Sequence, residues 1–280
     1  MNIEKIIAVI VLYKSNLEES LSFTSLLKTI REKDHKITLL VYNNSPDYWS
    51  YAGEVFDGIS IINVNDSLNS GVSKAYNVAF TYAEKLDKSH VLLLDQDTKI
   101  SDSFFLDFLS SYETSKNINL GFYCPMIMNK QGLISPANFF LFTTRKISDL
   151  NEGTYPLKGL AIINSGLIIS TKLFQLVGGY NEKIKLDFSD FYFIKKVLQF
   201  EKNVVVFNSK CFHLLSSEEE VSFESALKRF DYYLEGAKYY NASFKGMYGL
   251  NLWIILRSLK ISLKYKTTEF ITKAFSSLLS

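Results

Sequence analysis

In the first hundred residues, short apolar runs alternate with segments of helical spacing, and this alternation limits the fold more than any other feature. The predicted strands are residues 6–12, 37–42, 59–64 and 91–94, and the predicted helices are residues 16–30 and 70–86. Units of strand, helix and strand form right-handed crossovers within a parallel sheet. We therefore expect an α/β fold with a mainly parallel central sheet flanked by helices. Ligands of such sheets bind beyond the carboxyl ends of the strands.

The second part of the chain is less regular and ends in a helical segment. The predicted helices are 101–112, 171–177 and 189–200, and the predicted strands are 120–128, 160–170 and 204–207, the last leading to His213. From residue 218 the pattern is helical to the end. We expect one domain over 1–217, with halves at about 1–100 and 101–217, and a C-terminal helical segment over 218–280.

Composition excludes several classes of protein. Hydrophobic residues make up 47% of the chain, which excludes a wholly disordered protein. The formal net charge of +2 lacks the basic excess expected of a protein that binds nucleic acid. Cys124 and Cys211 form no Cys-x-x-Cys pair, so we expect buried thiols in a reducing compartment. The apolar run at 6–12 is too short to span a membrane, and no other stretch is long and apolar enough. These features predict a cytoplasmic protein.

Two acidic residues directly follow the predicted strand at 91–94. Asp95 and Asp97 are separated by Gln96, so two carboxylates lie just beyond the carboxyl end of one strand. Carboxylates in this arrangement bind Mg²⁺ or Mn²⁺ and leave coordination positions open. The alternative is a solvated acidic turn or a helix cap. His213 follows another apolar strand and is either a structural histidine or a further ligand of the same ion.

A second acidic pair, Asp187 and Asp190, lies around a predicted helix start. Asp190 would either stabilise the first helical turn, by roughly 0.3–1 kcal/mol, or act as a general base. Asn69 and Gly71 open another helix, whose first N–H groups either bind an anion or belong to an ordinary capped end. The residues alone leave both alternatives open.

In their order along the chain, these segments resemble the GT-A-fold glycosyltransferases of family 2, above all the bacterial rhamnosyltransferase branch. The resemblance covers about residues 5–235. The similar segments are Val11-Leu12-Tyr13-Lys14, Asn43-Asn44-Ser45, Asn69-Ser70-Gly71-Val72 with Ala75 and Asn77, Leu93-Leu94-Asp95-Gln96-Asp97-Thr98, Gly178-Gly179-Tyr180-Asn181-Glu182, Leu186-Asp187-Phe188-Ser189-Asp190, His213, and Arg229-Phe230-Asp231-Tyr232-Tyr233. The Leu-Asp-Gln-Asp-Thr form at 94–98 is typical of the rhamnosyltransferase branch.

The resemblance implies an inverting, divalent-metal-dependent glycosyltransferase. It would move a sugar, rhamnose from dTDP-rhamnose, onto a glycan or lipid-linked acceptor in bacterial surface polysaccharide synthesis, such as that of O-antigen or capsule. Residues 1–100 would bind the nucleotide sugar and 101–217 the acceptor. Asp190 would be the catalytic base, and Asp97, Asp95 and His213 would bind Mg²⁺ or Mn²⁺. The implied nucleotide-sugar contacts are Tyr13, Asn43, Asn69, Gly71, Lys74, Asp95, Gln96 and Asp187.

Several positions depart from the family pattern, and two of them bear on the site. Asn43 replaces the acid that contacts the base, and Tyr192 stands where a second acid often follows the catalytic one. An amide both donates and accepts, so base binding need not be lost. The departures keep two alternatives open: a transferase of the same fold that uses another UDP- or dTDP-hexose, such as glucose or galactose, and an inactive nucleotide-sugar-binding or scaffold module.

The segment 246–280 combines apolar and aromatic residues with basic ones, and Glu269 is its one acidic residue. This pattern predicts an interfacial helix, in peripheral contact with the inner face of the cytoplasmic membrane. The alternative is a helix that packs on the catalytic domain and exposes a solvated basic face.

Overall fold

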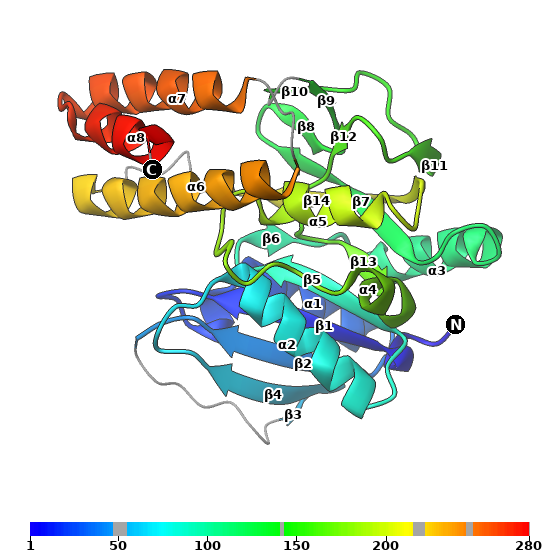
Figure 1. Ribbon diagram of the computed structural model, residues 1–280. Helices are drawn as coiled ribbons and strands as arrows, with labels where there is room; N and C mark the ends of the chain where they lie inside the picture. Colours follow the sequence, from blue (N-terminus) through cyan, green and yellow to red (C-terminus); the bar gives the residue numbers. More distant parts are fainter. Residues whose placement is uncertain (47–54, 141–142, 215–221, 245–248, 280) are drawn as a thin grey trace.

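A computed structural model of the chain describes residues 1–46, 55–140, 143–214, 222–244 and 249–279. Within these residues, eleven strands form one curled sheet, with a separate sheet of three short strands beside it. Helices cover both faces of the large sheet, and the last helices stack at one end of the molecule (Figure 1).

The N-terminal half of the large sheet is parallel, as predicted. Its strands, in spatial order, are β4 (Ile59–Asn65), β2 (Ile37–Asn43), β1 (Ile6–Leu12) and β5 (His90–Asp95). Every residue of β1 is buried, because α1 (Leu21–Glu32) covers one face of the sheet and α2 (Val72–Lys85) the other. A central strand covered on both faces requires the continuous apolar run seen in the sequence.

The first helix starts later than its apolar spacing suggests. Residues 17–19 form a short 3-10 turn, and α1 begins at Leu21 because the Ser20 hydroxyl accepts a hydrogen bond from the Phe23 amide, 3.3 Å away. A serine side chain that satisfies a free N–H group is a strong helix start. This cap also matters for the site, since Ser20 and Ser22 both contact the Asp95–Thr98 turn.

The second half turns the sheet into a mixed one. The predicted strand at 160–170 is instead two short strands, β12 (Leu160–Ala161) and β13 (Ile168–Ser170), separated by a turn at Asn164 and Gly166. Gly166 has φ +87 and its amide donates to Leu93, which reverses the chain. β13 then pairs antiparallel with both β5 and β7 (Phe122–Asn129).

The predicted short strand at 204–207 extends much further. It is β14 (Asn203–His213), parallel to β7 and joined at its far end by β6 (Thr98–Lys99). The remaining strands are β3 (Val55–Phe56), β8 (Gly132–Ser135), β9 (Ala137–Phe140), β10 (Thr143–Arg145) and β11 (Gly153–Pro156). The remaining helices of this domain are α3 (Phe104–Ser115), α4 (Thr171–Val177) and α5 (Ser189–Val197).

The C-terminal segment forms α6 (Phe223–Ser243), α7 (Leu250–Tyr265) and α8 (Glu269–Leu279), which lie side by side (Figure 1). These helices share a small apolar core with Phe188 of the preceding domain. Gly236 permits this packing, since a Cβ there would come within 2.4 Å of the Asp187 carbonyl oxygen. The segment is therefore attached to the domain beside Asp187, and no described helix has the length and apolarity to cross a membrane.

Candidate active site

The carboxyl ends of the parallel strands bring the first predicted site residues to one edge of the sheet. Asp95 ends β5 opposite Val11, and Asn43 ends β2 opposite both Leu12 and Asn65. Tyr13 follows β1 directly and is 39% exposed. The register thus aligns residues from different strands without any loop contribution, which is the usual ligand position of a parallel sheet.

Asp95, Asp97 and His213 form a cluster suited to a divalent cation. Each offers one ligand atom, and these atoms all lie within 4.8 Å of one another. His213 reaches the cluster because β14 pairs with β6, which places its Nδ1 3.4 Å from Asp97 Oδ1. The Asp97 side chain is 28% exposed and that of His213 is 11% exposed, so a ligand can approach from one side. Two carboxylates and an imidazole could together hold a divalent metal ion.

A network of hydroxyl groups behind the cluster orients its ligands. The Ser165 hydroxyl donates to Thr98 Oγ1 at 2.7 Å, and Thr98 Oγ1 lies 2.7 Å from His213 Nδ1. Ser165 Oγ also accepts a hydrogen bond from the Asp95 amide at 2.9 Å. Because Ser165 contacts both sides of the cluster, it couples the acidic turn to the histidine. Such supporting partners typically change metal affinity when they are removed.

Asp95 has a second support, Tyr76 of α2. The Tyr76 hydroxyl donates to Asp95 Oδ1 at 3.1 Å from a fully buried position. Burial, and then the negative charge of Asp95, raise the pKa of Tyr76 well above its ordinary value, so the phenol keeps its proton and remains a donor. The sequence offers one signal for this residue, its place between Ala75 and Asn77 of the similar segment.

Gln96, predicted to contact the nucleotide sugar, holds the backbone of the site together. Its Oε1 accepts the Tyr13 amide at 2.8 Å, and its carbonyl oxygen accepts the Ser20 hydroxyl at 2.9 Å. The side chain therefore ties the end of β5 to the end of β1, while the carbonyl fixes the start of α1.

Asn43, which was predicted to contact the base of the nucleotide, is buried at the end of β2. Its Oδ1 accepts the Ser45 amide at 2.9 Å, and its Nδ2 donates to Asn65 Oδ1 at 3.2 Å. Asn44 beside it has a buried Oδ1 with no hydrogen-bond partner among the described residues. An unsatisfied buried acceptor of this kind is costly unless a ligand or water completes it.

The sequence argument missed an acid in this corner, Asp66. It follows β4 and accepts hydrogen bonds from the Tyr42 hydroxyl and the Ser70 amide, both at 2.9 Å. Burial alone would raise the pKa of Asp66, but the donors from Ser70 and Tyr42 outweigh it and hold that pKa below its usual value. Asp66 is therefore a carboxylate beside Asn43, and the polar pair Asn65-Asp66 after an apolar strand is the signal that would have found it.

The predicted contacts Asn69, Gly71 and Lys74 lie at the start of α2. Gly71 has φ +97, and a Cβ there would lie 2.2 Å from the Lys185 carbonyl oxygen, which the Val72 amide contacts at 2.8 Å. The glycine is thus required for close packing, and one N–H group at this helix start is already satisfied by the chain. Lys74 Nζ lies 3.0 Å from Glu182 Oε2 on the surface.

Asp190, the predicted base, lies in the first turn of α5. Its Oδ1 accepts the Phe191 amide at 2.7 Å. Burial raises the pKa of Asp190 to about 7, and the negative charges of Asp187 and Asp95 act in the same direction. A carboxyl group with this pKa can take a proton near neutral pH and release it again, which is what a general base requires.

The start of α5 is connected to the metal cluster through buried polar groups. Asn164 Nδ2 donates to the Ser189 hydroxyl at 3.1 Å, and Asn164 Oδ1 accepts the Tyr180 hydroxyl at 2.8 Å. The Tyr180 ring in turn lies 5.1 Å, between centroids, from the ring of Tyr76, which contacts Asp95. Buried side chains therefore connect the start of α5, where Asp190 lies, with Asp95 of the cluster.

Asp187 lies apart from the other residues that were predicted to contact the nucleotide sugar. Its Oδ1 is 3.7 Å from Arg257 Nη2 on α7, and its Oδ2 is buried without a hydrogen-bond partner in the described part of the chain. It is not one of the residues of the metal cluster. Its side chain thus faces the C-terminal helices.

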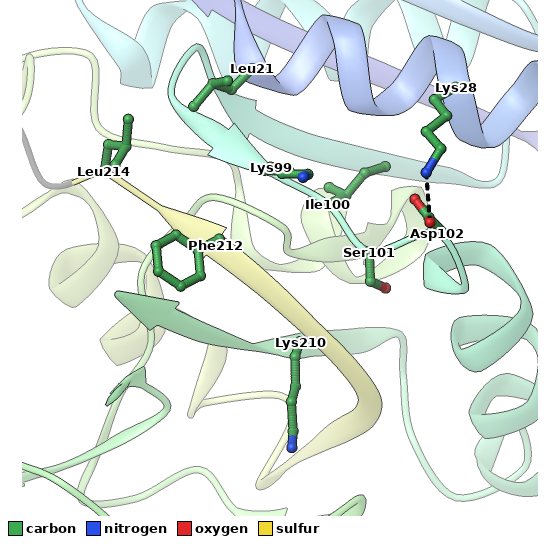
Figure 2. Close-up of a pocket in the computed structure, with 9 residues that line it drawn as sticks. All are labelled: Leu21, Lys28, Lys99, Ile100, Ser101, Asp102, Lys210, Phe212 and Leu214. Atoms are coloured by element: carbon green, nitrogen blue, oxygen red, sulfur yellow. Dashed lines mark hydrogen bonds and ion pairs between the residues drawn. The ribbon is translucent and has the colours of Figure 1, made fainter. Parts of the chain in front are cut away.

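A hollow of about 460 Å³ lies on the other face of the β6–β14 pair (Figure 2). The side chains of Thr98 and His213 lie on the face of this pair that carries the metal cluster. Their chain neighbours Lys99 and Phe212, which also pair with each other, line the hollow on the opposite face. Lys28 and Asp102 close one end of it with an ion pair of 2.7 Å. None of the site residues predicted from the sequence lines this hollow.

Comparisons with known proteins agree with this arrangement. No known family profile matches the chain. The dTDP-rhamnosyl transferase RfbF of Shigella flexneri is 26% identical over 122 residues, which is 44% of this chain and 41% of that protein. The chain therefore matches less than half the length of this curated relative.

Among solved structures, TarS of S. aureus is similar with a TM-score of 0.56 and 15% identity, over 85% of this chain and 39% of that protein. The fragment 1–349 of TarS in complex with UDP-GlcNAc has a TM-score of 0.55 and 15% identity, over 92% of this chain and 78% of the fragment. The GT-A fold expected from the sequence is confirmed, and so is the resemblance to family-2 glycosyltransferases related to rhamnosyltransferases.

Proposed function

We propose that this GT-A-fold chain is a glycosyltransferase that binds a nucleoside-diphosphate sugar through Mg²⁺ or Mn²⁺ and transfers the sugar, with inversion, to a hydroxyl group of a glycan or lipid-linked acceptor. One observation carries the proposal. A cluster suited to a divalent cation, Asp95, Asp97 and His213, and a carboxyl group with a pKa of about 7, Asp190, are held by one buried network at the carboxyl edge of the sheet.

In this reaction Asp190 takes the proton of the acceptor hydroxyl. The acceptor oxygen then bonds to C1 of the donor sugar while the bond from C1 to the diphosphate oxygen breaks, and attack opposite the leaving group inverts the configuration. A cation held by Asp97, Asp95 and His213 would offset negative charge on the departing nucleoside diphosphate. Ser165 and Tyr76 keep these ligands in place through hydrogen bonds to Thr98 and Asp95.

For the donor we propose dTDP-rhamnose. The identity with a dTDP-rhamnosyl transferase and the Asp95-Gln96-Asp97-Thr98 segment support it. TarS was solved with UDP-GlcNAc, so a UDP- or dTDP-hexose such as glucose or galactose is the alternative donor. An inactive nucleotide-sugar-binding module is the alternative of another class. We assign binding of the nucleotide base to Tyr13, Asn43 and Asp66. Asp66 supplies the carboxylate that Asn43 lacks.

A panel of nucleotide sugars with Mn²⁺ or Mg²⁺, followed by thermal shift, tests the donor. We expect dTDP-rhamnose to raise the melting temperature most, and only with the metal, because a ligand that binds the folded state stabilises it. Release of free nucleoside diphosphate without acceptor then separates a slow transferase from an inactive module. A chain that binds no nucleotide sugar with either metal would contradict the proposal.

We further propose that α7 lies on an anionic membrane surface at the cytoplasmic face. Leu252, Leu256, Leu259 and Leu263 are 58%, 43%, 42% and 80% exposed. Their spacing puts them along one face of the helix, and Lys264 lies beside Leu263, as in interfacial helices. The acceptor would then be lipid-linked and would reach the site from the membrane.

Co-sedimentation with vesicles tests this association. Leu256→Gln with Leu263→Gln should reduce binding to phosphatidylglycerol vesicles by about tenfold, since each change removes exposed apolar area. Leu106→Gln on α3 is the matched control, because Leu106 is 50% exposed but lies on another helix. Equal binding by all the variants would exclude α7 as the contact.

A further inference from the structure

A second hollow, of about 200 Å³, lies between the start of α5 and α7. Residues far apart in the sequence meet there: Phe139 from β9, Asp187 and Phe191 from the α5 region, Tyr233 from α6, and Trp253 and Arg257 from α7. Phe139 and Phe191 lie close, with ring centroids 4.7 Å apart. The wall of the hollow is therefore mostly aromatic, with one acidic residue, Asp187, and one cationic residue, Arg257.

The two charged residues leave hydrogen-bonding capacity in this wall. Asp187 Oδ2 is buried and has no partner among the described residues. Arg257 Nη2 lies 3.7 Å from Asp187 Oδ1, too far for a hydrogen bond, and the guanidinium stacks on the Tyr233 ring at 4.0 Å from its centroid. A buried carboxylate oxygen without a donor costs free energy, so a ligand with hydroxyl groups would stabilise the arrangement.

The position of the hollow ties it to the proposed reaction. Phe188 and Phe191 line it and flank Asp190 in the chain, while none of Asp95, Asp97 and His213 lines it. Phe188 has φ +73, an unusual conformation for a bulky residue, and its ring packs into the core of the C-terminal helices. Asp190 does not line the hollow itself, but the charges of Asp187 and of Asp95 both act on it, so it lies near the wall of the hollow and near the metal cluster.

The chemistry of the wall favours a sugar ring over a lipid tail. Aromatic rings offer flat apolar surfaces for the C–H faces of a pyranose, and a planar carboxylate and guanidinium offer fixed hydrogen bonds for its hydroxyls. An alkyl chain would leave the buried Asp187 Oδ2 without a hydrogen-bond donor. A hollow of about 200 Å³ is large enough for one sugar ring.

We propose that this hollow binds the sugar unit of the acceptor whose hydroxyl group Asp190 deprotonates, and that Asp187 and Arg257 bind the other hydroxyls of that unit. This inference rests on the proposed function. It assigns Asp187 to the acceptor instead of the nucleotide sugar. It also makes α7 a part of the acceptor site, so that the C-terminal segment selects the acceptor.

Trp253 offers a direct reporter, because Trp49 is the only other tryptophan of the sequence. In a full-length Trp49→Phe chain with dTDP and Mn²⁺, the emission of Trp253 is followed during titration with methyl glycosides of glucose, galactose, mannose, rhamnose and N-acetylglucosamine. We expect at least one of them to give a saturable change. Its affinity should fall at least tenfold in Arg257→Ala and in Asp187→Asn, while Lys260→Ala on the same helix leaves it unchanged.

Nucleotide binding keeps the two proposals distinct. Both variants should bind dTDP with Mn²⁺ as the parent does, which also shows that they are folded. If dTDP binds but no glycoside changes the emission, or if Arg257→Ala binds glycosides as well as the parent, this inference is wrong and the proposed function stands. If glycosides bind but no nucleotide does, the proposed function is wrong and the hollow remains a sugar site.

Discussion

The proposed donor edge of the sheet and the proposed acceptor side beside α7 are built in opposite ways. At the donor edge, Asn43 and Asp95 follow apolar strands, and the sheet register alone places them together. On the acceptor side, Asp187 and Arg257 come from distant segments that meet only because α6 and α7 pack on residues 187 and 188. An edge fixed by backbone pairing tolerates little change, whereas a wall made by packed helices can change its residues and so its specificity.

The largest expected effect on nucleotide binding breaks the donor edge alone. Asp97→Ala removes one carboxylate of the cluster, so metal-dependent binding of dTDP or UDP should weaken by more than about 100-fold, beyond the effect of losing a supporting partner. Titration calorimetry with Mn²⁺ measures it. Asp102→Ala, an acid of the hollow in Figure 2 that pairs with Lys28, is the control and should bind normally. Normal nucleotide binding by Asp97→Ala would remove this residue from the metal site.

Asp190→Asn tests the group between the two regions. Transfer should slow by about 10²–10⁴-fold, the usual contribution of general acid–base catalysis. Nucleotide affinity should stay within about twofold, since the amide keeps the shape of the side chain. Steady-state transfer and calorimetry separate the two effects. Substantial residual transfer would contradict the role of Asp190 as base.

The raised pKa of Asp190 has consequences for both rate and stability. Transfer should fall as the pH drops below about 7, because the base becomes protonated. Since the folded pKa lies above the unfolded one, folding favours the protonated form, and the stability that Asp190 contributes at low pH is lost as the pH rises towards 7.

Urea unfolding of the metal-free chain at pH 5 and pH 8 measures this loss. The parent should lose about 1–3 kcal/mol relative to Asp190→Asn between these values. Other titrating groups are common to both chains and cancel in the difference. Parallel pH profiles of the two chains would show that Asp190 titrates normally.

The smallest expected effect lies behind the donor edge. Tyr76→Phe removes the hydroxyl that donates to Asp95 Oδ1. Metal-dependent nucleotide affinity should fall about tenfold, as for other supporting partners of metal ligands. Tyr82→Phe on the same helix is the matched control, and competition with the nucleotide measures both. An unchanged affinity in Tyr76→Phe would mean that Ser165 alone orients Asp95.

Local pattern predicted the elements whose environment is uniform along their length. The strand at 6–12 and the helix at 171–177 have the bounds expected from the sequence, because both faces of the strand are buried and Ser170 and Gly178 cap the helix. The expected strand at 160–170 was wrong in its middle, where the Asn164–Gly166 turn interrupts an otherwise apolar run. A single turn of this kind reverses the chain, yet it hardly alters the apolar composition of the segment from which the strand was predicted.

The acidic turn could be singled out as a candidate metal site because Asp95 and Asp97 follow a strand end, and strand ends gather at one edge. For His213 the residues alone left a structural role open. Tyr76 and Ser165 could not be found in the same way, since each acts through a hydrogen bond to a residue distant in the sequence. Spacing along the chain carries no information about such contacts.

By itself, then, the sequence determined the parallel half of the sheet and the place of the acidic turn at its carboxyl edge, because apolar periodicity and strand-end position are local properties. Only the tertiary structure decided what surrounds them. Burial in the packed interior raises the pKa of Asp190, and helix packing brings Arg257 to Asp187. Both effects depend on the distance between side chains in space, which no pattern of residues along one chain specifies.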